Sequence, residues 1–259
     1  MDSIDYADSH CHLNYPGLVE IQDDVITRMH KNNIKYALNV CTKLEEFDKI
    51  YKTVSQHDFL YASVGIHPDT TKNSEATVKK LCEIGYKKKV VAIGETGLDY
   101  FRKEGENLDW QRERFRKHIR AARELKKPLI IHMREATEDT LKILKEEKAV
   151  DCGGVMHCFT ESLEVAKRAI DLNFLISISG IVTFKKAEQV QKVAANLPIE
   201  SLMVETDSPF LAPVPYRGKL NEPSHVSRVV EKISNLRDES EQYIAGKTLL
   251  NFKQFVKAS

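Results

Sequence analysis

The sequence lacks both a leader-like start and any apolar run of the roughly 20 residues that cross a bilayer. Its first residues, MDSIDYADSHCHLN, contain no basic segment followed by an apolar one. Cysteine is scarce, with five widely spaced residues and no CxxC pair. Such scattered cysteines favour reduced, mostly buried thiols over a disulfide framework. We therefore expect a cytoplasmic protein that is neither secreted nor inserted in a membrane.

Neither sign of charge is in excess, because 39 Lys and Arg face 38 Asp and Glu. A protein without a general basic field is poorly suited to coating long stretches of duplex, although an enzyme can still grip a few phosphates at one site. The 259 residues, 42% of them hydrophobic, can build a sizeable core. That length is ordinary for one α/β barrel, so we expect a single domain over residues 1–259, and we favour a monomer.

Short apolar runs recur along the chain, and each is followed by an amphipathic stretch. The expected strands cover residues 6–13, 35–41, 60–68, 90–99, 128–134, 152–159, 174–180 and 202–209. The stretches between them have helical spacing, as in Phe115, Ile119 and Ala122. Near-continuous apolar runs suit parallel strands covered on both faces. The pattern predicts an α/β fold, a single (β/α)8 TIM-type barrel. A doubly wound open sheet is the alternative, but eight units without an early GxGxxG motif favour the barrel.

Functional sites of such barrels lie at the C-terminal ends of the strands. The histidines and carboxylates that fall at these ends are His10, His12, His67, Glu95, His132, His157 and Asp207. In the expected first strand, His10 and His12 point to one face and Cys11 points to the other. An HxH pair taken alone fits two satisfied core histidines as well as it fits a metal site. The isolated His132 and His157 are, taken singly, more typical of structural histidines.

Taken together, these residues indicate a metal centre at the ends of the strands. A carboxylate such as Glu95 or Asp207 at the end of an apolar strand is costly unless it is paired or bound to a cation. Gly94, just before Glu95, allows close backbone approach, and Glu205 shares a face with Asp207 and fits a position behind it. Four histidines and two carboxylates fit the ligands of two divalent cations with a bridging carboxylate better than they fit residues that only fill the barrel interior.

Residues near the expected site suggest contacts to an anionic substrate. The segment YRGKLNEP at 216–223 follows the last strand, so Arg217 is placed to meet a phosphate and Asn221 to orient it. An ordinary basic loop is the alternative. Arg134 points to the same side as His132 and is within reach of an anion, and Tyr100 in GLDYF is a candidate for stacking on a base.

The order of short motifs resembles the TatD family of metal-dependent deoxyribonucleases, within the amidohydrolase-like barrels. The blocks are DSHCHL, VGIHP, GETGLDY, IHMR, MHCF, SGIVTF, ETDSPFLAP and RGKLNEP, which together cover residues 8 to about 252. The resemblance implies one cation held by His10, His12, Glu95 and Asp207. It implies a second held by the bridging Glu95 with His132 and His157. It further places His67 and Asp99 beside the metals, Glu205 behind Asp207, and Arg217 on the substrate phosphate.

The activity that this resemblance implies is phosphodiester hydrolysis by a water activated between two cations. The expected partner is DNA, attacked by 3′–5′ exonuclease action at single-stranded ends with few phosphate contacts, and RNA is a further candidate. Asp207 is the expected proton acceptor, Glu95 the bridge, and His67 a group near the leaving oxygen. Histidine nitrogen favours Zn, Mn or Co over Mg, whereas the family is commonly associated with Mg.

Two other readings of the same residues stay open at the level of sequence. An amidohydrolase of another kind would act on an amide, a lactone or a phosphotriester. Many of those barrels bridge their metals with a modified lysine at the end of the fourth strand, where this chain has Glu95. A metal-binding protein without catalytic activity is the second alternative, and the complete set of expected ligands argues against it.

Overall fold

The computed structural model describes residues 3–71 and 75–257, and it confirms the predicted (β/α)8 barrel. The strands are β1 (Tyr6–Cys11), β2 (Ile34–Asn39), β3 (Leu60–Val64), β4 (Val90–Asp99), β5 (Leu129–Arg134), β6 (Gly154–Met156), β7 (Phe174–Ile178) and β8 (Leu202–Val204). Each pairs in parallel with the next, so strands that are consecutive in the chain are neighbours throughout the sheet. The segment after β8 returns to β1 through a parallel bridge between Cys11 and Ser208.

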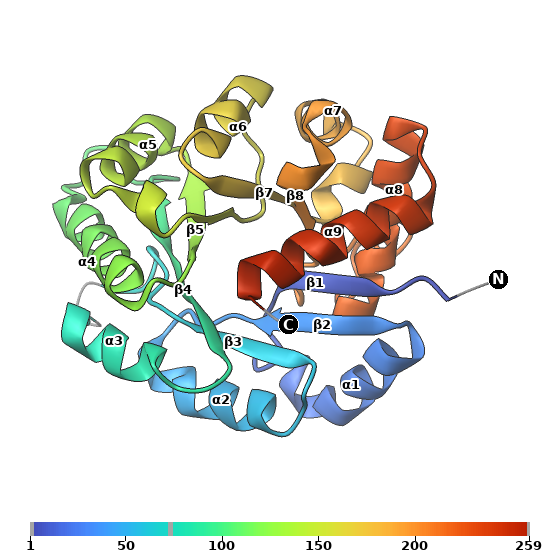
Figure 1. The fold of residues 1–259 in the computed structure, drawn as a ribbon, viewed down its shortest axis with the longest axis horizontal. Helices are drawn as coiled ribbons and strands as arrows, with labels where there is room; N and C mark the ends of the chain where they lie inside the picture. The colour runs from blue at the N-terminus through green and yellow to red at the C-terminus, as the bar shows by residue number, and fades with distance from the viewer. Residues whose placement is uncertain (1–2, 72–74, 258–259) are drawn as a thin grey trace.

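Helices form a ring outside the strands (Figure 1). The ring consists of α1 (Gln22–Lys31), α2 (Phe47–Ser55), α3 (Val78–Gly85), α4 (Asp109–Leu125), α5 (Thr137–Glu146), α6 (Leu163–Ile170), α7 (Glu188–Asn196) and α8 (Val226–Arg237), and α9 (Glu241–Val256) follows it in the chain. Short 3-10 turns are η1 (Val19–Ile21), η2 (Leu44–Glu46), η3 (Ala149–Asp151), η4 (Gly180–Thr183), η5 (Ile199–Ser201) and η6 (Pro223–His225). The predicted helical face of Phe115, Ile119 and Ala122 is buried on α4. Among the described helices, none is both long and apolar enough to cross a membrane.

Helix α9 closes one end of the barrel (Figure 1). A compact apolar cluster joins alternate residues of the strands, such as Leu38, Ile130 and Met203, to Phe252 and Phe255 of α9. Side chains from strands this far apart in the sheet meet only in the barrel interior. Because this cluster fills the N-terminal end, the open mouth of the barrel lies at the C-terminal ends of the strands.

All of the expected strands except the fourth are longer than the observed ones, and the largest differences lie at the C-terminal ends of β3, β6 and β8. Residues 65–68, 157–159 and 205–209 leave the sheet ladder after β3, β6 and β8. The backbone turns there, with positive φ at Cys158 (44°) and Asp207 (54°). A residue other than glycine in this left-handed region does not continue a strand. The two histidines and two carboxylates in these segments, His67, His157, Glu205 and Asp207, are therefore presented on loops that directly follow the strands.

The buried His118 on α4 gives the fold a testable dependence on pH. Its Nε2 accepts a hydrogen bond from the Ile66 backbone N–H at 3.0 Å, and its Nδ1–H donates to the Arg114 carbonyl at 2.8 Å. Burial lowers the pKa of His118 to about 4. In the unfolded chain the imidazole binds a proton near pH 6.5, so its contribution to stability is complete above pH 6.5 and is lost as the pH falls towards 4.

We therefore expect replacement of His118 by glutamine to flatten the acid limb of the stability profile. Between pH 6.5 and 4, the wild-type protein should lose about 3 kcal/mol more unfolding free energy than His118→Gln. Urea unfolding at a series of pH values measures this difference, and contributions from the other histidines cancel in it. Parallel profiles for the two proteins would contradict the assignment of a neutral His118.

Candidate metal centre and its cleft

The open mouth of the barrel holds a cleft of about 720 Å³. Its walls include residues from the ends of β1, β4, β5, β6 and β8, among them His12, Glu95, His132, His157 and Asp207. The parallel topology explains this gathering, because all strands of the barrel end at the same mouth. The structure thus brings together side chains that are almost 200 residues apart in the chain.

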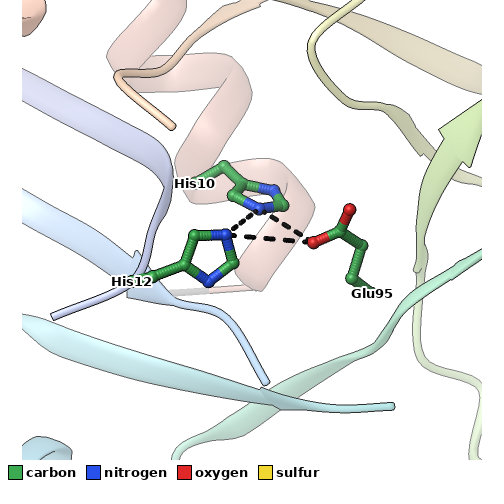
Figure 2. A group of neighbouring side chains, drawn as sticks. All are labelled: His10, His12 and Glu95. Atoms are coloured by element: carbon green, nitrogen blue, oxygen red, sulfur yellow. Dashed lines mark hydrogen bonds and ion pairs between the residues drawn. The ribbon is translucent and has the colours of Figure 1, made fainter. Parts of the chain in front are cut away.

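One group of ligand atoms surrounds a point between β1, β4 and the loop after β8. Its Nε2 atoms, on His10 and His12, are 3.2 Å apart, and Glu95 Oε2 lies 3.3 Å from the first of them (Figure 2). Asp207 Oδ1 lies 3.7 Å and 3.5 Å from the same two nitrogens. Ligand atoms about 2.1 Å from a shared tetrahedral centre are about 3.4 Å apart, so this spacing fits a divalent cation.

A second group of ligand atoms faces the other oxygen of Glu95. Its Oε1 lies 2.9 Å from His157 Nε2, 3.2 Å from His132 Nδ1 and 3.3 Å from His67 Nε2. His67 and His132 are themselves 3.3 Å apart through these nitrogens. His67, expected only beside the metals, therefore lies at ligand distance in this group. The donor sets fit two cations, with Glu95 as the residue common to both groups.

Close packing of β4 against β5 places Glu95 between the two groups. Gly94 has a φ of 150°, and a Cβ on it would lie 2.6 Å from the Ile130 carbonyl oxygen. Only glycine fits this approach, as the sequence predicts. The register of β4 against β5 shifts between Ile93 and Thr96, the two residues that flank Gly94 and Glu95.

Asp8 ties β1 to the segment that carries Asp207, and sequence reasoning missed it. Its carboxyl accepts hydrogen bonds from the Thr206 N–H at 2.9 Å, the Thr206 hydroxyl at 2.5 Å and the His10 N–H at 3.2 Å. The Asp207 N–H in turn donates to the His10 carbonyl at 2.9 Å. Burial raises the pKa of Asp8 to about 8. An aspartate inside the apolar run of β1 is the sequence signal that points to such a structural role.

The histidines keep Glu95 in the form that binds a cation. Burial by itself raises the pKa of Glu95, but the imidazoles of His157 and His67 outweigh it and hold the pKa well below its usual range. Burial lowers the pKa of His157, whereas Glu95 and Glu205 raise it, and the net pKa lies well above the usual range. Glu95 and His157 therefore each shift the pKa of the other, Glu95 downwards and His157 upwards.

Two carboxylates back the histidines of the second group. Glu205 Oε1 lies 3.3 Å from His157 Nδ1 and accepts the Cys158 N–H at 2.7 Å, so it supports His157 where Asp207 was expected. Asp99 Oδ2 lies 3.1 Å from His132 Nε2, and its side chain is largely buried. Asp99 therefore orients an imidazole, and it is not among the residues that line the cleft for a substrate.

Of the other expected substrate contacts, only Arg134 lines the cleft. The Tyr100 hydroxyl donates to Asp139 at 2.7 Å, so this ring is held against α5. Asn221 is fully buried and donates to the Thr206 and Phe210 carbonyls, which stabilises the loop after β8. Arg217 lies outside the cleft lining, with its guanidinium 3.8 Å from the centre of the Phe184 ring.

Several residues that the sequence analysis passed over line the cleft, and three of them matter for a substrate. They are Tyr15, Lys43 and Phe210, from the loops after β1, β2 and β8. Their only signal in the sequence is their position within a few residues of the end of an expected strand. Cys11 does not line the cleft: its thiol donates to the Leu38 carbonyl at 3.4 Å and belongs to the core between sheet and helices.

A parallel (β/α)8 barrel with two ligand groups at its C-terminal mouth has the architecture of a metal-dependent hydrolase. Comparison with known proteins narrows this class. The model of the family described as TatD related DNase matches residues 7–257, and the chain therefore belongs to that family.

Curated relatives and solved structures agree with this assignment. The chain is 45% identical to the "Uncharacterized metal-dependent hydrolase YcfH" of Escherichia coli (strain K12), over 95% of this chain and 93% of that protein. It is 40% identical to the "Uncharacterized metal-dependent hydrolase YabD" of Bacillus subtilis (strain 168), over 96% of this chain and 98% of that protein. The crystal structure of YjjV, a TatD homologue from Escherichia coli K12, superimposes with a TM-score of 0.89 at 27% identity and 98% coverage of both chains.

Proposed function

We propose that this metal-dependent hydrolase cleaves phosphodiester bonds of DNA, as a 3′–5′ exonuclease on single-stranded ends, with RNA as a further substrate. The observation that carries the proposal is the shared carboxylate of Glu95. Its two oxygens each belong to a separate group of ligand atoms at the base of an open cleft. Paired cations about 3.5–4 Å apart are the usual arrangement for stabilising both the attacking and the leaving oxygen in phosphodiester hydrolysis.

Divalent cations bound at these two groups would lower the pKa of a water and offset the negative charge of the reacting phosphate. Asp207 receives the proton of the attacking water in this mechanism. Burial raises the pKa of Asp207, but hydrogen bonding to His12 and the charge of His10 outweigh it and keep the carboxylate ionised. An ionised carboxylate beside the reacting water is suited to act as the general base.

Two cationic side chains of the cleft support an anionic polymer as the substrate. Lys43 and Arg134 line the cleft from the loop after β2 and the end of β5. In addition, His67 lies on the open side of the second ligand group, where it is partly exposed and can contact the leaving oxygen. With a net charge of only +1, the protein is suited to gripping a few phosphates at a strand end.

Digestion of end-labelled single-stranded DNA, duplex DNA and RNA across Mg, Mn and Zn tests the proposal. We expect stepwise shortening from the 3′ end, faster on single strands than on duplex, and complete loss of activity with a chelator. A parallel panel of amides, lactones and phosphotriesters tests the other amidohydrolase chemistries. Turnover in that panel, or tight metal binding without cleavage of any nucleic acid, would overturn the proposal.

A further inference from the structure

Two aromatic rings stand together on the wall of the cleft, next to the first ligand group. Tyr15 follows β1 and Phe210 follows β8, and their ring centres are 5.6 Å apart in an edge-to-face arrangement. The Phe210 ring centre is 6.4 Å from that of His12. Phe210 lines the same cleft as Asp207, and its side chain is 48% exposed. The protein therefore keeps an apolar ring in solvent directly beside its candidate metal ligands.

The backbone holds Phe210 firmly in this exposed position. Its N–H donates to the Asp207 carbonyl at 3.0 Å, and its carbonyl accepts from the fully buried Asn221 at 2.6 Å. Tyr15 is fixed in a similar way, because its hydroxyl lies 3.4 Å from the Thr42 hydroxyl. Because the backbone of Phe210 is already fixed, the loop loses little conformational entropy when a flat ligand covers the ring.

The core does not account for the position of Phe210. It belongs to neither apolar cluster of the barrel, and its ring contributes little to folding while it is half exposed. Tyr100, the base-stacking residue that the sequence suggested, has its hydroxyl bound to Asp139. The Phe210–Tyr15 pair is therefore the aromatic surface that the cleft offers to a ligand.

We propose that Phe210, supported by Tyr15, stacks against the base of the terminal nucleotide while the adjacent phosphate lies at the two ligand groups. This inference rests on the proposed nuclease function and names the part of the substrate that this wall recognises. The distance from His12 to Phe210 is within the reach of one nucleotide from phosphate to base. Since every base has a π face, such a wall accepts all four bases and requires only that a base is present.

Single-stranded oligonucleotides that differ only in the terminal residue test the inference. One substrate ends in a normal nucleotide, and the other ends in an abasic residue at the end that is cleaved. We expect the wild-type protein to prefer the normal end by about tenfold in kcat/KM, mainly through KM. The preference should fall to near one in Phe210→Leu and should be retained in Phe210→Tyr, which keeps a ring.

A matched control is available on the outside of the barrel. Tyr86, at the end of α3, is 70% exposed and far from the cleft lining, so Tyr86→Leu makes a similar change of ring to aliphatic side chain. This variant should show the wild-type preference. Because the ratio is internal to each variant, a uniform loss of activity in Phe210→Leu that leaves the ratio unchanged contradicts the inference.

The outcomes separate the inference from the function on which it rests. If the wild-type protein cleaves normal and abasic ends equally well, the stacking role is wrong and the nuclease proposal stands. If Phe210→Leu keeps the tenfold preference, the stacking role is likewise wrong and the nuclease proposal stands. If the wild-type protein cleaves neither substrate with any divalent metal, both the nuclease proposal and the stacking role fail together.

Discussion

Replacement of Glu95 by glutamine is expected to reduce hydrolytic activity by on the order of 10³-fold or more. The reason is that both oxygens of this one carboxylate are in use. Oε2 lies 3.3 Å from His10 Nε2, and Oε1 lies 2.9 Å from His157 Nε2. Glutamine offers one oxygen and one NH₂ group, and an amide NH₂ is a donor that cannot bind a cation. Loss of cation chemistry worth several kcal/mol corresponds to the stated factor.

Two measurements on the same sample test this prediction. The first is kcat/KM on single-stranded DNA, and the second is the amount of bound divalent metal by elemental analysis after gel filtration. Glu95→Gln preserves side-chain volume, so the barrel should remain folded while both quantities fall. Glu104→Gln is the matched control, because Glu104 is exposed in the loop after β4. Wild-type metal content together with wild-type turnover in Glu95→Gln would rule out a shared bridge.

The barrel and the gathering of the candidate ligands at one mouth could be predicted from sequence because both follow from the order of parallel strands. Parallel strands end at one mouth, so the histidines and carboxylates at the ends of six of the eight apolar runs are expected to approach one another. His132 and Glu95 lie on β5 and β4 themselves, and the Glu95 position follows from Gly94 before it. The alternation of side chains along a strand predicts which of them point towards the barrel interior.

Side chains on the loops could not be placed by the same reasoning. β3 ends at Val64, so the approach of His67 to Glu95 depends on the path of the loop that follows. Asn221 was expected to face the substrate, yet it is used to satisfy loop carbonyls that would otherwise be buried without a partner. A polar loop residue can serve either purpose, and only the three-dimensional path decides between them. The exposure of Phe210 is unpredictable for the same reason.

Replacement of Arg114 by methionine is expected to lower the unfolding free energy by about 3–5 kcal/mol. Arg114 is only 1% exposed on α4, and it reaches the loop after β3. It donates to Glu75 Oε1 at 2.9 Å, to the His67 carbonyl at 2.9 Å and to the Thr70 carbonyl at 2.8 Å. Methionine fills part of the volume but leaves these carbonyls without their charged donor and Glu75 with the Lys117 ammonium at 3.5 Å.

The same contacts connect the stability of α4 to the candidate centre, because the His67 carbonyl belongs to a residue of the second ligand group. Urea unfolding at neutral pH measures the loss, and Arg120→Met is the matched control. Arg120 lies on the same helix and is ion-paired with Glu147 at 2.7 Å, but its side chain is 46% exposed. An exposed pair contributes about 1 kcal/mol or less, so this control should stay close to the wild type. Equal effects of the two substitutions would show that Arg114 does not anchor the His67 loop, and the support for His67 would then have to come from its own contacts with Glu95 and His132.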